Sequence, residues 1–288
     1  MGSIAPARTV PRLDFSRFLK GTDADRASFC QDLIDSLCNV GFVKLINHGI
    51  TDAELAHIFD MNAKFFAMPL DAKNKAAHPP EPNPHRGYSY VGQEKLSMVK
   101  DYEKGNRDHV AVHDIKVLTV SLPFFTFYLT KPRNHMISAQ LMITCTPTAG
   151  CEAAQITAGA KRISEHTDFG TVTLLFQDSV GGLEIEDQAN TGNYFPVAFE
   201  GRSELIVNVG DCLARWTNDR FRSTSHRVVL PPVFSDWVDD RYSIAYFAKP
   251  NRTQSVATLP EFVKPGQKAL YDDISAWEYN QRKLLLTY

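Results

Sequence analysis

The spacing of hydrophobic and polar positions divides the chain into a helix-rich first part and a strand-rich second part. Apolar residues between positions 29 and 37 recur every three or four residues, which is the spacing of one helix face. The pattern predicts a helix over 23–40, a strand rich in β-formers over 41–47 and a second helix over 51–66. A short strand is predicted over 10–20, before the first helix.

From Arg162 onward, short segments with the two-residue alternation of strands are separated by turns. The predicted strands are 171–176, 183–186, 205–209, 227–230 and 242–247, and a last helix is predicted over 275–286. Between the two parts, the proline-rich stretch 78–87 must be a loop, because proline interrupts both helices and strand ladders. Short strands at such even spacing favour a sandwich or a barrel, so the expected fold class is mainly β with flanking helices.

The amino-acid composition indicates which classes of binding partner and which cellular compartment to expect. The 288 residues are 43% hydrophobic and 22% charged, which fits one large globular domain or two small ones. A formal net charge of −2 gives no electrostatic reason to expect a nucleic acid or an anionic membrane as partner. The five cysteines are irregularly spaced without a Cys-x-x-Cys pair, which favours a reducing compartment and a cytoplasmic location.

Neither export nor membrane insertion is expected from the sequence. No basic segment followed by an apolar one stands at the N-terminus, so no secretory signal is visible. The longest apolar run, 117–129, is shorter than the about 20 residues that a membrane-spanning helix needs. We therefore interpret this run as a buried segment.

Two histidines and one aspartate are candidate ligands of a metal ion. His166 and Asp168 are two positions apart, and side chains at i and i+2 leave a strand on the same face. The third ligand must come from elsewhere, and His226, at the start of a predicted strand, is the candidate. Two imidazoles and one carboxylate bind iron(II) on one face and leave positions open for a co-substrate and dioxygen. Alone, a His-x-Asp tripeptide is a weak signal, because a single histidine is more often structural or exposed.

Arg241 and Ser243 are a candidate receptor for a carboxylate group. They are also two positions apart on a predicted strand, so a guanidinium and a hydroxyl share one face. These groups together can donate several hydrogen bonds to a carboxylate. The alternative is that Arg241 is an ordinary solvated strand residue that pairs with Asp239 or Asp240.

Taken in order along the chain, these residues and several further motifs resemble one enzyme family. The motifs are Gly41-Phe-Val-Lys-Leu-Ile-Asn-His-Gly-Ile50, Phe65-Phe-Ala-Met-Pro-Leu70, His85-Arg-Gly-Tyr-Ser89, His166-Thr-Asp-Phe-Gly170, Asn208-Val-Gly-Asp211, Trp216-Thr-Asn-Asp-Arg-Phe221 and Arg241-Tyr-Ser243. Over roughly residues 10–112 and 160–288, the chain is similar to the isopenicillin N synthase-like branch of the iron(II)/2-oxoglutarate-dependent dioxygenases.

The resemblance implies a double-stranded β-helix (jelly-roll) core and an iron(II) ion held by His166, Asp168 and His226. It implies that the far carboxylate of 2-oxoglutarate meets Arg241 and Ser243, and that no catalytic residue is needed beyond the metal ligands. Oxidative decarboxylation of 2-oxoglutarate with dioxygen (O2) would then be coupled to hydroxylation, desaturation or ring formation. The expected substrate is a small organic molecule of secondary metabolism, and no motif indicates an oligomeric state.

The resemblance also predicts a division of the chain into three parts. Residues 1–112 correspond to the N-terminal helix and strand region, and 161–288 to the jelly-roll core with the iron and 2-oxoglutarate site and the C-terminal helix. Residues 113–160 diverge from the family, whose members usually carry an Asn and a Tyr in a strand before His-x-Asp. Residues 140–160 contain neither, and the chain is short for the family. Either this stretch is mis-spliced or frame-shifted, or it is a genuine divergence.

Two alternatives to a 2-oxoglutarate-dependent dioxygenase stay open at this point. An iron oxidase could use Arg241 and Ser243 for a substrate carboxylate and need no 2-oxoglutarate. A catalytically impaired relative or a β-barrel binding protein is the second alternative, which the unusual stretch 115–158 suggests. A zinc hydrolase is disfavoured, because no glutamate base stands in a zinc motif. We expect His48 to be structural and His85 to be a solvated loop residue.

Overall fold

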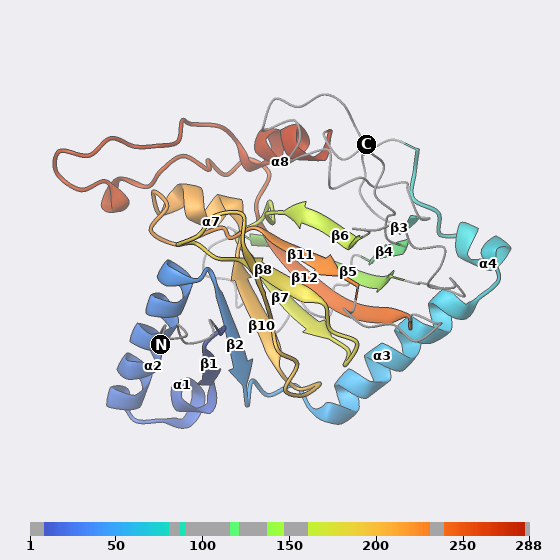
Figure 1. The fold of residues 1–288 in the computed structure, drawn as a ribbon. Coiled ribbons are helices and arrows are strands. Elements are labelled where there is room, and N and C mark those ends of the chain that lie inside the picture. Colours follow the sequence, from blue (N-terminus) through green and yellow to red (C-terminus); the bar gives the residue numbers. More distant parts are fainter. Residues whose placement is uncertain are drawn as a thin grey trace, which may run out of the picture.

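The computed structural model describes residues 9–80, 87–89, 116–120, 137–146, 161–230 and 239–285, with the backbone alone for 116–120 and 137–146. Its strands form two sheets (Figure 1). In spatial order, the large sheet contains β1 (Arg12–Asp14), β2 (Phe42–Ile46), β10 (Leu205–Val209), β7 (Val172–Gln177), β12 (Arg241–Pro250), β5 (Ile137–Thr146), β4 (Lys116–Val120) and β3 (Gly87–Ser89). The small sheet contains β6 (Lys161–His166), β11 (His226–Val229), β8 (Leu183–Glu186) and β9 (Tyr194–Pro196).

Every pair of these strands is antiparallel except β1 with β2, which are parallel. Neighbours in a sheet are often distant in sequence, as β7 lies between β10 and β12, and β11 lies between β6 and β8. Two facing antiparallel sheets with such crossover connections make a jelly roll. The expected fold class, a mainly β jelly-roll core with flanking helices, is confirmed.

The helices surround the sheets rather than alternate with the strands (Figure 1). They are α1 (Ser16–Lys20), α2 (Asp23–Asn39), α3 (Asp52–Ala67), α4 (Leu70–Asn74), α7 (Asp211–Trp216), α8 (Ala276–Leu284) and the 3-10 helix η2 (Pro260–Phe262). Both long helices begin with a capping box, in which Thr22 and Asp25, and likewise Thr51 and Glu54, bond to each other's backbone N–H groups. These boxes explain why α2 and α3 start where the sequence predicts.

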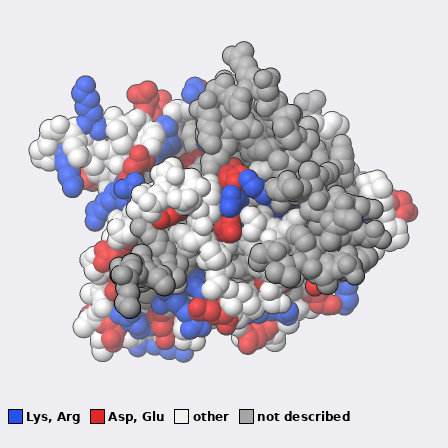
Figure 2. All heavy atoms as spheres, in the orientation of Figure 1, with Lys and Arg blue, Asp and Glu red and all other residues white. Residues whose placement is uncertain are grey.

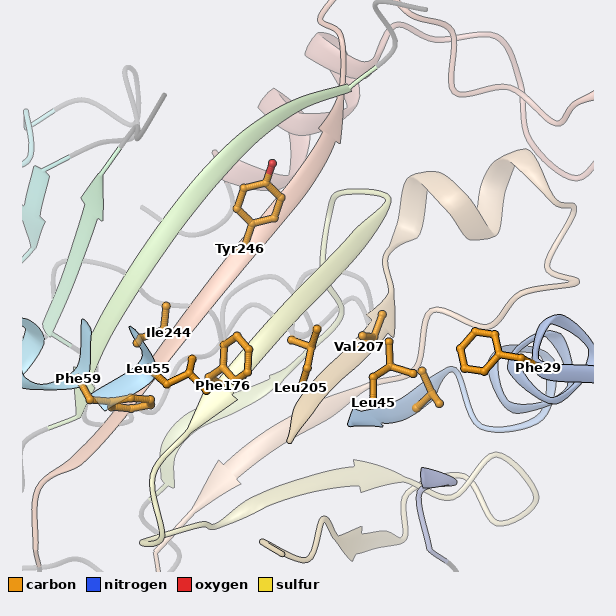
Figure 3. Packing of buried hydrophobic residues seen from close by; sticks show 10 residues of the cluster. Phe29, Leu45, Leu55, Phe59, Phe176, Leu205, Val207, Ile244 and Tyr246 are labelled. Carbon is orange, nitrogen blue, oxygen red and sulfur yellow. The ribbon is translucent and has the colours of Figure 1, made fainter. Parts of the chain in front are cut away.

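Alternation along β7 gives the large sheet two different faces. Phe176 belongs to the apolar cluster drawn in Figure 3, which includes Phe29 of α2 and Leu55 of α3, and Leu174 packs against this cluster. Leu175 faces the other way and packs in a second apolar cluster, whose members on the small sheet include Ile185. Because side chains alternate along a strand, Thr173 and Gln177 share the face of Leu175. Polar residues are therefore buried between the two sheets, next to apolar ones.

One prediction about local structure is wrong. Residues 16–20 form the helix α1 instead of continuing the short strand predicted over 10–20. The strand ends because the carboxylate of Asp14 accepts hydrogen bonds from the backbone N–H of Ser16, at 2.9 Å, and from the side chain of Asn47. This turn brings the ring of Phe18 against Phe29 of α2, with centroids 5.9 Å apart.

No helix within the described ranges is long and apolar enough to cross a membrane. The apolar run 117–129 lies mostly outside the described residues, although the backbone of 116–120 forms β4 between β3 and β5. His85 and most of the loop predicted over 78–87 also lie outside them.

Candidate active site

The fold brings His166, Asp168 and His226 together. His166 ends β6 and His226 begins β11, and the two residues are direct partners in the small sheet. The Nε2 atoms of both imidazoles lie 3.8 Å from Oδ1 of Asp168. Within the described residues, this is the one group of at least three His, Cys, Asp or Glu side chains whose ligand atoms lie within 4.8 Å of one another. Asp168 follows two residues after the end of β6, and the pairing of His226 with His166 adds the third side chain, so the short spacing and the sheet register together produce the cluster.

Both histidine rings are oriented by backbone carbonyls. Nδ1 of His166 lies 2.8 Å from the carbonyl oxygen of Ser164, and Nδ1 of His226 lies 3.1 Å from that of Thr224. A carbonyl oxygen can only accept a hydrogen bond, so each Nδ1 carries the proton in the neutral ring. Each Nε2 then presents its lone pair to the centre of the cluster, as a metal ligand must.

Two hydrogen bonds fix the carboxylate of Asp168 on the side away from the histidines. Its Oδ2 atom accepts hydrogen bonds from Thr173 at 2.6 Å and from Asn208 at 2.7 Å, which leaves Oδ1 toward the two histidines. Burial alone would raise the pKa of Asp168, but the neighbouring His226 and His166 and the two hydrogen bonds lower it below its ordinary value. The carboxylate therefore favours its charged form, although only 6% of its residue surface is exposed.

These donor atoms fit an iron(II) ion. A cation with metal–ligand bonds of about 2.1 Å can reach two atoms that lie 3.8 Å apart. Two neutral imidazoles and one carboxylate on one side leave the other side of the ion open, which is typical of non-haem iron(II) oxygenases. The nearby thiol of Cys212 does not suit a metal, because burial raises its pKa to about 12 and keeps it protonated.

Arg241 and Ser243 lie on β12 and are both buried between the sheets, with 1% and 3% of their surface exposed. The guanidinium donates to the side chain of Gln177 at 2.9 Å, to the carbonyl oxygen of Gly181 at 2.6 Å and to the hydroxyl of Ser243 at 3.3 Å. The alternative that Arg241 is an ordinary solvated strand residue is therefore wrong.

Burial makes the charge of Arg241 costly. The pKa of the guanidinium is lowered to about 10, chiefly by burial, with Asp178 opposing the shift and Arg162 adding to it. An anionic group bound against Arg241 would stabilise the charged form again. The arrangement therefore suits the carboxylate of a small molecule.

Several residues around the site were not assigned a role from sequence. Thr173 lies in the predicted strand 171–176 and Asn208 in a recognised motif, but the hydrogen bonds that they donate to Asp168 depend on the pairing of β7 with β10. Gln177 was missed, although its two-residue spacing from Leu175 is a signal that it faces the interior. His48 is structural as expected, because its ring bonds to the carbonyl oxygen of Ser203 and packs against Phe176.

Part of the divergent stretch lies beside the carboxylate receptor. The backbone of β5 pairs with all of β12, with Thr146 opposite Arg241 and Thr144 opposite Ser243. The edge of β12 is therefore covered by a strand even though the stretch lacks the Asn and Tyr that are usual in the family. The division of the chain at residues 112 and 160 stays a prediction.

Two family models together match most of the chain. A family model described as non-haem dioxygenase in morphine synthesis N-terminal matches residues 10–114, and the 2OG-Fe(II) oxygenase superfamily model matches residues 141–250. The 2-oxoglutarate-Fe(II) type oxidoreductase ppzD of Metarhizium rileyi is 50% identical over 98% of this chain and 92% of its own length. Proline hydroxylase buaE of Petromyces alliaceus is 41% identical over 97% of this chain and 99% of its own length.

The alignment with the Metarhizium rileyi relative spans 326 positions, whereas this chain has 288 residues. At least 38 positions of the alignment (326 − 288) therefore have no residue of this chain. This difference agrees with the expectation that the chain is short for its family.

Solved structures give the same assignment. A full-length Neurospora crassa protein in complex with alpha-KG and thymine has a TM-score of 0.79 and 27% identity, over 97% of both chains. The complex of the same protein with alpha-KG has a TM-score of 0.78 and 28% identity, over 96% of both chains. The chain belongs to the family of iron(II)/2-oxoglutarate-dependent dioxygenases, which use Fe(2+), 2-oxoglutarate and O2 to oxidise a small organic metabolite.

Proposed function

We propose that His166, Asp168 and His226 hold the iron(II) ion and that Arg241 and Ser243 bind the far carboxylate of 2-oxoglutarate. The observation that carries this proposal is the geometry of the three ligand atoms, which lie within 4.8 Å of one another. Nδ1 of each imidazole bonds to a backbone carbonyl oxygen, so Nε2 of each ring points to the centre of the group. The receptor role of Arg241 is supported by a buried guanidinium beside a hydroxyl on the same strand face.

When bound, iron(II) with 2-oxoglutarate and dioxygen supplies an oxidant strong enough to break a C–H bond. The residues of this chain hold and orient the reacting groups, and they do not react themselves. Thr173 and Asn208 fix the carboxylate of Asp168, so that one oxygen points to the ion. The apolar side chains between the sheets, such as Ile185 and Leu175, exclude water and protect the oxidant from wasteful reactions.

We propose further that the substrate is proline or a related cyclic amino acid and that the reaction is hydroxylation. The support is the similarity to proline hydroxylase buaE, which is 41% identical over 99% of its length. Other fungal relatives of similar coverage are described as 2-oxoglutarate-dependent dioxygenases, which supports a role in fungal secondary metabolism.

The substrate proposal is tested by incubating the iron-loaded protein with 2-oxoglutarate, air and L-proline, and following succinate and amino acid products by mass spectrometry. We expect a product with one added oxygen atom, formed in a one-to-one ratio with succinate. Pipecolate, an amino acid with a ring larger by one carbon, is the matched second substrate. Succinate release without oxygenation of either amino acid would contradict the substrate class but not the co-substrate.

A catalytically impaired relative is the second candidate function. It is supported by the at least 38 alignment positions (326 − 288) that this chain lacks relative to the Metarhizium rileyi enzyme. The two candidates differ in turnover. An impaired relative forms the visible charge-transfer band of the anaerobic iron(II)–2-oxoglutarate chelate, but it produces no succinate with any of these substrates in air.

We also propose a cytoplasmic location and no nucleic acid or membrane partner. Cys30, Cys38 and Cys212 are free thiols in the described part of the chain, as is usual in a reducing compartment. Acidic and basic side chains are interspersed over the described part of the face in Figure 2, and the net charge is −2. Such a surface provides no extended positive patch on that face for a polyanion.

Replacing Arg241 by glutamine is expected to raise the KM for 2-oxoglutarate by about 30-fold or more, equivalent to about 2 kcal/mol. The guanidinium is fully buried, so a bound carboxylate loses a charge-assisted partner that water cannot replace. The kcat at saturating 2-oxoglutarate should fall much less, because the iron ligands are unchanged. Steady-state kinetics with 2-oxoglutarate as the varied substrate measure both.

Arg252→Gln is the matched control, because Arg252 is exposed and stacks on Trp277 outside the sheets. It should leave the KM for 2-oxoglutarate unchanged. If the KM is equally unaffected in Arg241→Gln and the melting temperature shows a folded protein, Arg241 does not bind the co-substrate.

A further inference from the structure

The carboxylate of Asp211 connects several segments around the proposed metal ligands. Asp211 is the first residue of α7 and only 8% exposed. Its backbone N–H donates to the carbonyl oxygen of Asp168 at 2.7 Å, and its Oδ2 atom accepts a hydrogen bond from Thr167 at 3.2 Å. Its Oδ1 atom accepts one from Ser223 at 2.6 Å, in the segment that leads to His226. Asp211 therefore contacts the approaches to all three proposed ligands.

The C-terminal helix α8 supplies the other partners of this carboxylate. The hydroxyl of Tyr279 donates to Oδ2 of Asp211 at 2.8 Å, and Nζ of Lys283 lies 3.4 Å from the same oxygen. Lys283 also lies over the ring of Phe169, with Nζ 5.7 Å from its centroid. Tyr279 and Lys283 are four positions apart, so they share one face of the helix.

A second contact joins α8 to β12 at the same place. Nζ of Lys249, which is half-buried, donates to the side chain of Asn280 at 3.3 Å. Lys249 packs close to the turn after Asp168, because a side chain on Gly170 would meet its Cγ atom at 3.4 Å. Figure 1 shows α7 and α8 at the same end of the sheets. Tyr279, Asn280 and Lys283 of α8 therefore contact Asp211, Lys249 and Phe169, which lie in or next to the turn after His166.

We infer that α8 is a positioning element of the iron centre, in which Tyr279 and Lys283 fix the carboxylate of Asp211 and Asp211 in turn fixes the turn between His166 and Asp168. This inference rests on the proposed iron site. Tyr279 and Lys283 act through the carboxylate of Asp211, which both of them contact, and are therefore positioning residues. Without them, Asp211 keeps its bonds to Thr167 and Ser223 but loses the charge and hydroxyl that hold Oδ2.

The chemistry of Tyr279 suits this role. Burial raises the pKa of its phenol well above the ordinary value, and the carboxylate of Asp211 raises it further. The phenol therefore stays protonated and donates to Asp211 throughout the neutral pH range. A donor that never ionises holds the carboxylate in one place, which the geometry of a metal site requires.

The experiment compares Tyr279→Phe and Lys283→Gln with the matched control Arg282→Gln. Arg282 is the neighbour of Lys283 on the same helix turn, but it is exposed and pairs with Glu278 on the outside. Both glutamine variants remove one positive charge from the same helix end. For each protein, iron(II) affinity is measured by anaerobic titration in the presence of 2-oxoglutarate, and the melting temperature is measured without metal.

We expect Tyr279→Phe and Lys283→Gln each to weaken iron(II) binding by about tenfold, the lower end of the effect of partners that orient metal ligands. The charge-transfer band of the chelate should shift or broaden in both variants, and Arg282→Gln should match the unchanged protein within about twofold. If both variants lower only the melting temperature and bind iron as the unchanged protein does, α8 is a packing element and the inference is overturned. Failure of the unchanged protein to bind iron would instead overturn the proposed function, and this inference with it.

Discussion

Replacing Asp168 by alanine is expected to weaken iron(II) binding by more than about 100-fold and to abolish succinate formation. The reason is the charge of the proposed site, since Asp168 is the anionic member of the three proposed ligands and a histidine is neutral when it binds a metal. Partners that only orient a ligand cost 10–100-fold in affinity, so loss of the ligand itself should cost more. The substitution also leaves Thr173 and Asn208 without their acceptor.

Thermal unfolding with and without iron(II) separates lost binding from lost folding. A ligand present at about 100 times its Kd stabilises the folded state by about 2.7 kcal/mol, so the unchanged protein should melt at a higher temperature with the metal. Asp168→Ala should melt at the same temperature with and without it. Asp60→Ala, which removes an exposed carboxylate of α3, should keep the full metal-dependent increase. An equal increase in Asp168→Ala would show that the ion is held elsewhere.

Sequence was informative about the fold wherever the signal is local. The helices α2 and α3 carry a capping residue and an apolar face within a few positions, and β8 carries its own alternation. The helix α7 has no such signal, because six residues are too few to show a helical period and too few to be stable alone. It forms because the N–H groups of Asp211 and Cys212 donate to the carbonyl oxygens of Asp168 and Gly170.

The same distinction explains what could be expected of the site. Arg241 and Ser243 are two positions apart on β12, so the geometry of a strand places both on one face. His166 and Asp168 have the same spacing, but β6 ends at His166, so the expectation that one strand carries both is wrong. Hydrogen bonds from Thr173 and Asn208 fix the carboxylate of Asp168 just beyond the strand. Gln177 contacts Arg241 only because β7 and β12 pair with Gln177 opposite Ser243, and strand register between distant segments has no local signal. The contact between Asp211 and Tyr279 joins residues 68 positions apart and depends on where α8 packs.

Replacing Lys44 by methionine is expected to lower the free energy of unfolding by about 3 kcal/mol or more. Lys44 lies in the middle of β2 with 4% of its side chain exposed. Its Nζ atom lies 3.3 Å from both Glu200 and Glu204, and it donates to the carbonyl oxygen of Ala198 at 3.1 Å. Glu204 is equally buried, so the substitution leaves a buried carboxylate whose remaining cation, Arg12, is 46% exposed. Unfolding in urea, analysed with an unchanged m-value, measures the loss.

Two further variants test whether the lower free energy of unfolding arises from the buried carboxylate of Glu204 left without Lys44. Arg12→Met removes the more exposed cation of the same cluster and should cost no more than about 1 kcal/mol, because the buried Lys44 remains beside Glu204. Adding Glu204→Met to Lys44→Met should restore part of the stability, because apolar side chains of similar volume can replace a buried ion pair at little cost. The double variant should therefore be more stable than Lys44→Met. If it is instead less stable, by as much as Glu204→Met alone destabilises the protein, the two residues act independently. The buried pair would then not stabilise the contact between β2 and the segment before β10.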